Sequence, residues 1–253
     1  MTVDGAAYVT ELRAAMDRVV DTQSEGVSRA ATLIVASLRT GGVVQAFGSG
    51  HSEALAMEIA GRAGGLVPTN KLALRDVVVF GGESPEVLVS GGGGTLERDP
   101  TIARRVLDLA AVDPNDVFVI ASNSGINGSV VEMARLVKER GHPLVAITSL
   151  QHTRRVEPRH PSGQRLADLA DVVLDNAAPY GDATLPLPGG GAVGAVSSVT
   201  AALLAQLIVA EVVRQLLAEG DQPPVYLSAN VPGGDEHNRT LEARYAGRIR
   251  RTA

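Results

Sequence analysis

The chain has 253 residues, of which 45% are hydrophobic and 3% aromatic, and its formal net charge is −5. This apolar content excludes a globally disordered chain, and the negative charge gives no reason to expect a nucleic-acid partner. The absence of cysteine excludes disulfides, cysteine-ligated zinc, thiolate nucleophiles and iron–sulfur clusters. With so few aromatic side chains, the core must consist of Ala, Val, Leu and Ile, which favours parallel strands covered by helices.

Neither a signal peptide nor a membrane span is predicted. The first residues lack the basic and then apolar order of a signal peptide, and acidic residues interrupt them. Residues 183–210 carry no charge, but prolines, glycines and hydroxyl side chains interrupt the about 20 apolar residues that a span requires. We expect this segment to form a buried core or interface helix in a soluble, cytoplasmic protein.

Two helices are predicted before the first strand. Apolar residues recur at helical spacing over residues 8–21 and again over residues 25–38, and the second helix ends at Gly41 and Gly42. We therefore expect a helical hairpin within an N-terminal extension over residues 1–40, which would serve dimerisation.

Strands and helices then alternate along the chain. The predicted strands cover residues 43–47, 76–80, 116–120, 144–147 and 171–174. The predicted helices that follow them cover residues 53–62, 130–140 and 192–217. Strands separated by helices at this spacing form a doubly wound parallel sheet, which binds ligands at the carboxyl ends of its strands. We expect one α/β domain over residues 1–253, with a C-terminal tail at 221–253.

The loop after the first strand has the composition of an oxyanion site. It consists of Gly48, Ser49, Gly50, His51 and Ser52. Glycine lets the backbone approach a ligand, the following helix offers unpaired N–H groups, and serine hydroxyls are rotatable donors. By itself the loop resembles half of a dinucleotide-binding fingerprint. The third glycine of that fingerprint is missing, which disfavours a nucleotide.

A second loop, after the strand at 116–120, contains Ser122, Asn123, Ser124 and Gly125. Alone, it is equally typical of turn chemistry followed by a helix cap. Two such loops, each between an apolar strand and a helix, indicate an anion-binding site much more specifically than either loop alone. Neither loop contains Lys or Arg, so recognition of an anion would depend on neutral donors and helix ends.

Together the two loops resemble those of the SIS (sugar isomerase) domain family, whose patterns are Gly-x-Gly-x-Ser and Ser-x-Ser-Gly-x-Thr. The residues that match are Gly48, Gly50, Ser52, Ser122, Ser124 and Gly125. Asn127 stands where the family usually has threonine, and its amide can still donate a hydrogen bond. The resemblance covers residues 25–217 and is strongest to a bacterial subgroup of stand-alone SIS proteins, whose ending is also similar to residues 228–238.

The resemblance implies a five-stranded parallel sheet between two layers of helices, and a homodimer with active sites near the subunit interface. It also implies a sugar phosphate as the ligand, with the phosphate held mainly by the second loop. The implied substrate-binding residues are Ser49, Gly50, His51, Ser52, Ser122, Asn123, Ser124, Asn127 and Ser129.

Three residues are candidates for moving protons. Glu58 lies on the helix after the first loop, where related isomerases carry a catalytic glutamate, although it could simply pair with Arg62 at i+4. Glu83 follows a glycine-rich turn, and SIS lyases that cleave a sugar ether use two glutamates; its alternative is a solvated loop carboxylate. His237 lies near a Gly-Gly turn in the tail, where an exposed position is the alternative.

The other histidines and acidic residues suggest neither a metal nor a cofactor. No cluster of His, Asp and Glu has metal-ligand spacing. His152 and His160 lie in a polar, basic segment and are predicted to be solvated.

The favoured interpretation is an enzyme that removes the C2 proton of an (amino)sugar 6-phosphate such as N-acetylglucosamine 6-phosphate. An isomerase would return a proton to C1, whereas a lyase or dehydratase would expel the C3 substituent, and the sequence leaves both open. The alternative is a non-catalytic phosphosugar sensor that acts through a protein partner.

Overall fold

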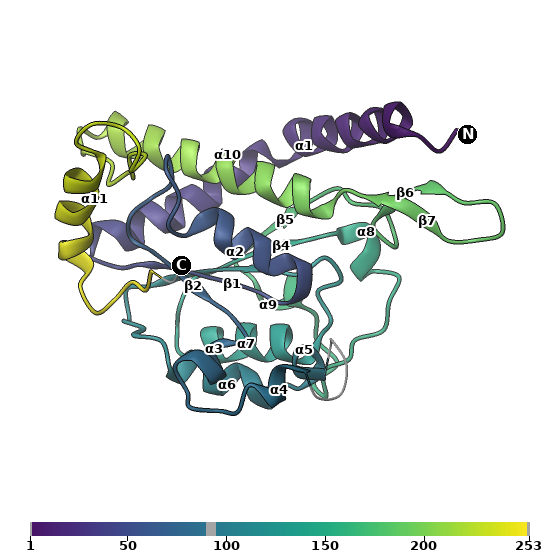
Figure 1. Ribbon diagram of the computed structural model, residues 1–253, viewed down its shortest axis with the longest axis horizontal. Helices are drawn as coiled ribbons and strands as arrows, with labels where there is room; N and C mark the ends of the chain where they lie inside the picture. Colours follow the sequence, from purple (N-terminus) through teal and green to yellow (C-terminus); the bar gives the residue numbers. More distant parts are fainter. Residues whose placement is uncertain (1, 90–94, 252–253) are drawn as a thin grey trace.

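A parallel sheet of five strands forms the centre of the protein, in the order β2-β1-β3-β4-β5, with helices on both faces (Figure 1). The computed structural model describes residues 2–89 and 95–251. The strands are β1 (Val44–Gly48), β2 (Thr69–Leu72), β3 (Val117–Ala121), β4 (Leu144–Thr148) and β5 (Val172–Asp175). All neighbouring strands pair in parallel. The doubly wound fold expected from the sequence is confirmed.

The longer helices are α1 (Gly5–Arg39), α2 (Glu53–Ile59), α6 (Thr101–Asp108), α7 (Gly128–Glu139), α10 (Ser197–Ala218) and α11 (Gly234–Glu242). Five of them, α1, α2, α6, α7 and α10, cover the sheet, whereas α11 lies at one end of the molecule (Figure 1) and packs through Leu241 on Val67 and Tyr226. The short helical segments are η1 (Gly50–Ser52), α3 (Asp76–Val79), α4 (Glu86–Val89), α5 (Thr95–Arg98), α8 (Leu150–Thr153), α9 (Leu166–Leu169) and η2 (Ala243–Tyr245). An antiparallel hairpin of β6 (Ala183–Pro186) and β7 (Ala192–Ala195) precedes α10.

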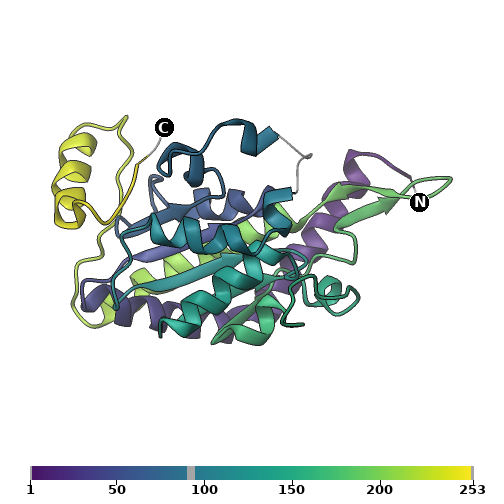
Figure 2. The same ribbon diagram turned by 90° about the horizontal axis from the view of Figure 1, so that it is seen from below.

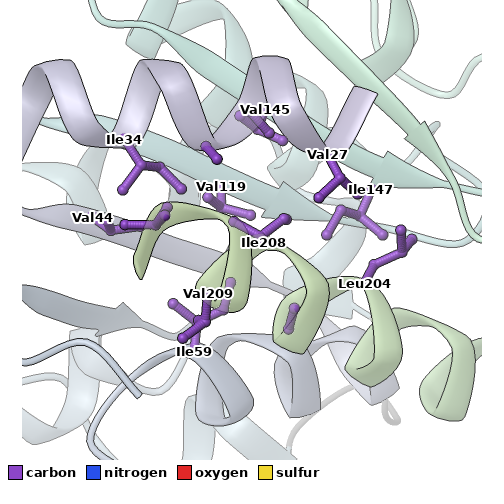
Figure 3. Close-up of a cluster of buried hydrophobic side chains, with 14 of the residues drawn as sticks. Val27, Ile34, Val44, Ile59, Val119, Val145, Ile147, Leu204, Ile208 and Val209 are labelled. Atoms are coloured by element: carbon purple, nitrogen blue, oxygen red, sulfur yellow. The ribbon is translucent and has the colours of Figure 1, made fainter. Parts of the chain in front are cut away.

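Along each inner strand, alternate side chains point to opposite faces of the sheet and pack into two separate hydrophobic cores. On one face, α1, α2 and α10 pack against the sheet; Figure 3 shows Ile34 of α1 and Ile208 of α10 beside Val119 of β3. On the other face, Phe118 and Ile120 of the same strand pack against α6 and α7. Because both faces are buried, β3 is apolar throughout, as expected for an inner parallel strand. Each fully buried Val, Ile or Phe side chain contributes about 1.5–3 kcal/mol of transfer free energy.

The predicted N-terminal hairpin is wrong, because α1 is one continuous helix of 35 residues. The residues between the two predicted helices, 22–24, include no glycine or proline that would end a helix. The hydroxyl of Thr22 instead donates to the carbonyl oxygen of Arg18 within the helix, at 2.6 Å. The helix therefore runs past the sheet, as Figure 2 shows.

The strand predicted at 76–80 is also wrong. These residues begin with the short helix α3, where the carboxylate of Asp76 accepts a hydrogen bond from the N–H of Ala73 at 3.0 Å. Val79 and Phe80 are exposed, so the apolar run is not a buried strand. The edge strand is β2, which was not predicted because its sequence, Thr-Asn-Lys-Leu, is mostly polar.

The predicted helix at 192–217 begins later than expected, since its first residues form β7 of the hairpin. By length and composition, α10 could cross a membrane. In this fold, however, Leu204, Ile208 and Val212 of α10 are buried in the core that α10 shares with α1. As expected, the segment forms a core helix.

Candidate active site

A cavity of about 730 Å³ lies at the carboxyl ends of β1 and β3. The two loops that follow these strands, far apart in the sequence, line it together. The predicted binding residues in its wall are Ser49, Gly50, His51, Ser52, Ser122, Asn123, Ser124 and Asn127. This is the edge of a parallel sheet at which α/β proteins bind their ligands.

The first loop turns sharply out of β1. Gly50 has a φ of 55°, in the left-handed region that favours glycine. The turn η1 then leads into α2. Among the described residues, neither the hydroxyl of the buried Ser49 nor that of Ser52 has a hydrogen-bond partner. Both hydroxyls are therefore available to an oxygen of a ligand.

The second loop is shaped by its own side chains. The Oγ of Ser122 accepts a hydrogen bond from the N–H of Gly125 at 3.1 Å, which closes the turn. The Oδ1 of Asn123 accepts one from the side-chain amide of Asn176, also at 3.1 Å. The hydroxyl of Ser124 lines the cavity without a partner in the part of the chain that the structure describes. Ser122 and Asn123 thus hold the loop, while Ser124 is free to bind.

Asn127, at the start of α7, presents a donor whose orientation is fixed. Its Oδ1 accepts a hydrogen bond from Nη1 of Arg159 at 2.9 Å, and its Nδ2 donates to Oε1 of Glu97 at 2.5 Å. A guanidinium can only donate, so the amide oxygen must face Arg159 and the NH₂ group must face Glu97. Arg159 also brings a positive charge to a loop that contains none.

Glu97, on α5, lies between the two loops. One carboxylate oxygen accepts the hydrogen bond from Asn127, and the other lies 2.9 Å from the position that a Cβ at Gly50 would take. Ser129 does not belong to the cavity wall; it is buried in α7 and donates to the backbone carbonyl of Glu97 at 2.9 Å. The sequence analysis missed Glu97, because its contacts join residues that are distant along the chain and no local pattern marks them.

His152, in α8, is half-buried and lines another part of the wall, where it was not predicted. Its Nδ1 lies 3.0 Å from the backbone N of Gly181. Its ring packs against that of Tyr180, with 5.2 Å between the centroids. Burial lowers the pKa of His152 below its ordinary value, and the nearby carboxylate of Asp182 opposes this shift. The sequence did offer one sign that His152 lies at the site, because the residue comes just after β4, at the carboxyl edge of the sheet.

Asp182 caps the amino end of α10 at the cavity. Its Oδ1 accepts hydrogen bonds from the N–H groups of Val196 and Ser197 at 3.1 and 2.8 Å, and its Oδ2 accepts one from the Ser197 hydroxyl at 2.7 Å. This carboxylate is therefore committed to the helix, whereas that of Glu97 accepts a hydrogen bond from the Asn127 amide and caps none of the described helices.

The three predicted catalytic residues lie elsewhere in this chain. Glu58 pairs with Arg62 and accepts a hydrogen bond from Gln206 at 2.6 Å. Glu83 pairs with Arg105 at the surface. His237, on α11, lies 3.0 Å from the carbonyl oxygen of Val225, to which its Nε2–H must donate. None of the three is among the described residues that line the cavity.

A metal site is not apparent in the described ranges, where no group of three or more His, Asp or Glu side chains could hold an ion. His160, predicted to be solvated, is in fact buried. Its ring nitrogens lie within hydrogen-bond distance of Ser162 Oγ and Glu132 Oε2, at 2.8 and 3.0 Å. It is a structural residue of the segment that carries Arg159.

Comparison with known sequences identifies relatives along almost the whole chain. A family model for the SIS domain matches residues 7–149. A UPF0309 protein of Listeria monocytogenes is 37% identical over 246 residues, which are 97% of this chain and 98% of the relative.

Solved structures share the fold at much lower identity. The phosphoheptose isomerase of Neisseria gonorrhoeae superimposes with a TM-score of 0.52 at 21% identity, over 82% of this chain and 95% of that one. The phosphoheptose isomerase of Francisella tularensis gives a TM-score of 0.54 at 16% identity, with the same shares of 82% and 95%. At these identities the similarity demonstrates the common architecture.

Proposed function

The chain belongs to the SIS domain family and, within it, to the UPF0309 proteins, and on this premise we propose that it is an enzyme acting on an (amino)sugar 6-phosphate. The reaction would begin with removal of the C2 proton, in a substrate such as N-acetylglucosamine 6-phosphate. The observation that carries the proposal is the meeting of two donor-rich loops and a carboxylate, Glu97, around one cavity at the carboxyl edge of the sheet.

The phosphate would bind between the loops. Ser49, Ser52 and Ser124 offer hydroxyls without other partners among the described residues, and Asn127 offers an oriented NH₂ group. That NH₂ group already donates to an anionic oxygen, that of Glu97, so it suits the oxygens of a phosphate as well. Arg159, behind Asn127, adds a favourable charge.

Glu97 would act as the base. Its carboxylate is in the cavity and does not cap a helix, unlike that of Asp182. Removal of the C2 proton leaves the C–H electron pair to form an enediolate with the neighbouring carbonyl. Return of a proton to C1 completes an isomerisation, and loss of the C3 substituent completes an elimination. Both reactions share the first step, so both agree with this site.

A panel of sugar 6-phosphates, incubated in D₂O and followed by NMR, tests the proposal. Deuterium at C2 is the expected result, and the further products separate isomerase from lyase or dehydratase. Binding without exchange would contradict the enzymatic reaction and favour a phosphosugar sensor. Failure of every phosphosugar to bind would overturn the site itself.

Paired variants test the assignment of the base. Glu97→Gln should slow C2 exchange by about 10²–10⁴-fold, the usual contribution of a general base, while substrate still binds. Glu139→Gln, which changes an exposed carboxylate paired with Arg135, is the control and should behave like the wild type. If Glu58→Gln abolishes exchange and Glu97→Gln does not, the base predicted from the sequence is the correct one.

We further propose a homodimer in the cytoplasm. The hairpin and the first half of α1 extend beyond the sheet (Figure 1), and Val9, Val20 and Val193 on them are 41%, 54% and 43% exposed. A second copy of the chain would cover these apolar side chains. Light scattering after size-exclusion chromatography should give twice the chain mass, and a monomer at all concentrations would contradict the proposal.

A further inference from the structure

The hydrogen bond between Gly181 and His152 determines which ring nitrogen of His152 carries the proton. The backbone N–H of Gly181 can only donate, so Nδ1 of His152, 3.0 Å away, must accept and must be unprotonated. The proton of the neutral ring is therefore on Nε2. An imidazolium has no acceptor nitrogen and would lose this hydrogen bond, in agreement with the lowered pKa of His152.

The turn that carries Gly181 is held in place on both sides. The N–H of Asp182 donates to the carbonyl oxygen of Pro179 at 2.9 Å, which closes the turn. Asp182 has a φ of 69°, a left-handed conformation that is uncommon outside glycine. Its hydrogen bonds to the start of α10 maintain this conformation. Strained residues of this kind concentrate at functional sites, where the surroundings impose them.

The other side of the ring is positioned by an aromatic contact. Tyr180 packs against His152 with an angle of 31° between the rings, and the guanidinium of Arg155 lies 5.7 Å from the centre of the Tyr180 ring. The charge that acts on the imidazole is that of Asp182, whereas Arg155 lies over the Tyr180 ring. The imidazole lines the cavity, and its Nε2 has no hydrogen-bond partner in the described ranges. A fixed, neutral donor is thus presented to the cavity.

We propose that His152 donates its Nε2–H to the carbonyl oxygen of the bound sugar phosphate and stabilises the enediolate formed from it. The inference rests on the proposed function, to which it adds the electrophilic partner of Glu97. A base pulls the C2 proton away more easily when the developing oxyanion already has a donor.

The proton and electron balance of this step is simple. The C2–H electron pair forms the C1–C2 double bond, the C1–O π pair becomes a lone pair on oxygen, and the proton moves to Glu97. His152 keeps its own proton and only donates a hydrogen bond to the oxygen. Because the oxygen carries more negative charge in the enediolate than in the substrate, this hydrogen bond strengthens along the reaction.

Two substitutions of His152 separate the donor from the bulk of the ring. His152→Leu removes the donor and should lower kcat for C2 exchange by about 10²–10³-fold, as loss of one oxyanion donor does, with little change in KM. His152→Gln places an amide N–H near the position of Nε2 and should recover part of that loss. Arg154→Gln changes an exposed neighbour and is the control. Wild-type kcat in His152→Leu would overturn the inference.

Nitrogen-15 NMR of the wild-type protein provides a test that needs no turnover. The His152 ring should show the Nε2–H tautomer near neutral pH, and its Nε2 signal should move when a sugar 6-phosphate is added. The ring of His142, buried beside Asp116, is the internal control and should not move. An Nδ1–H tautomer or an imidazolium would contradict the inference.

The same titration separates this inference from the proposed function. If the amides of residues 122–127 report binding while His152 does not respond, the inference fails and the phosphosugar site stands. If His152 responds but no C2 exchange occurs, the proposed reaction fails while the donor role to a bound sugar stands. If no phosphosugar binds, both are overturned.

Discussion

The two ends of the central sheet use polar side chains in opposite ways. At the amino ends of β1, β2 and β3, buried polar groups form hydrogen bonds with one another. At the carboxyl ends, the hydroxyls of Ser49 and Ser124 face a cavity and have no partner in the described part of the protein. The first end therefore contributes to folding, and the second is left available for a ligand.

Asp116 is the centre of the amino end. It is fully buried directly before β3, and four donors satisfy its carboxylate. These donors are the N–H groups of Val43 and Asp113, the amide of Gln45 and the guanidinium of Arg248. A buried carboxylate is tolerated only when it is satisfied as completely as this.

The hydrogen bonds continue from Gln45 to the C-terminal segment. Gln45 accepts from Asn70 of β2 at 3.0 Å, and Asn70 in turn accepts from the N–H of Arg250 at 2.9 Å. The guanidinium of Arg251 donates to the carbonyl oxygens of Val67 and Thr69, both at 2.8 Å. The C-terminal segment thus covers the edge strand of the sheet, which would otherwise expose unpaired backbone groups (Figure 1).

The largest expected effect is loss of stability at the amino end. Asp116→Ala removes the acceptor of four donors, including the guanidinium of Arg248, and should lower the free energy of unfolding by about 3–5 kcal/mol, as expected when one partner of a buried ion pair is removed. Urea titration measures this change. Asp108→Ala removes an exposed partner of Arg140 and should change it by about 1 kcal/mol or less. If both variants lose a similar free energy of unfolding, the polar groups at the amino end do not have the stabilising role assigned to them.

At the carboxyl end we expect a smaller effect, and it should be a loss of ligand binding rather than a loss of stability. Ser124→Ala removes one hydrogen bond to a charged phosphate and should weaken sugar-phosphate binding by about 1.5–3 kcal/mol. The free energy of unfolding should not fall, because this hydroxyl bonds to no other described residue. Calorimetric titration and urea unfolding of the same variant measure the two quantities. A clear loss of stability with unchanged affinity would contradict the assignment of the loop to a ligand.

The smallest effect should appear only at alkaline pH. Burial raises the pKa of Tyr226 to about 12, with a further contribution from Glu242 and an opposing one from Arg251. Because the phenol of the unfolded chain ionises at its ordinary pKa of 10.0, stability should fall as the pH rises from there to about 12. Tyr226→Phe should remove this part of the pH dependence, measured by thermal unfolding at several pH values. If the stability of Tyr226→Phe still falls as steeply above pH 10 as that of the wild type, the prediction is contradicted.

Much of the fold follows from local patterns in the sequence. The strands that became β1, β3, β4 and β5 are short apolar runs between helical segments, and each was predicted to within about two residues, the usual uncertainty of element boundaries. The edge strand β2 and the hairpin before α10 were missed. Both are held by pairing with other segments, β2 with β1 and β6 with β7, rather than by an apolar pattern of their own.

In the candidate site, too, some residues could be predicted from local patterns in the sequence and others could not. The two serine loops could be identified because glycine and serine between a strand and a helix have local consequences for the backbone. Glu97 and His152 could not, since one is defined by its contact with Asn127 and the other by a hydrogen bond from Gly181. The place of His152 just after a predicted strand puts it near the carboxyl edge of the sheet, but the contacts of both residues join segments that are distant in the sequence and form only when the chain folds.

The sequence by itself thus determined a parallel α/β fold with two donor-rich loops at one edge of its sheet, because strand, turn and helix propensities act between near neighbours. Only the tertiary structure decided that α1 continues as one helix, that Glu58 pairs with Gln206 outside the cavity, and that Glu97 and His152 lie within it. These outcomes depend on which distant segments pack together, and packing is a property of the whole chain.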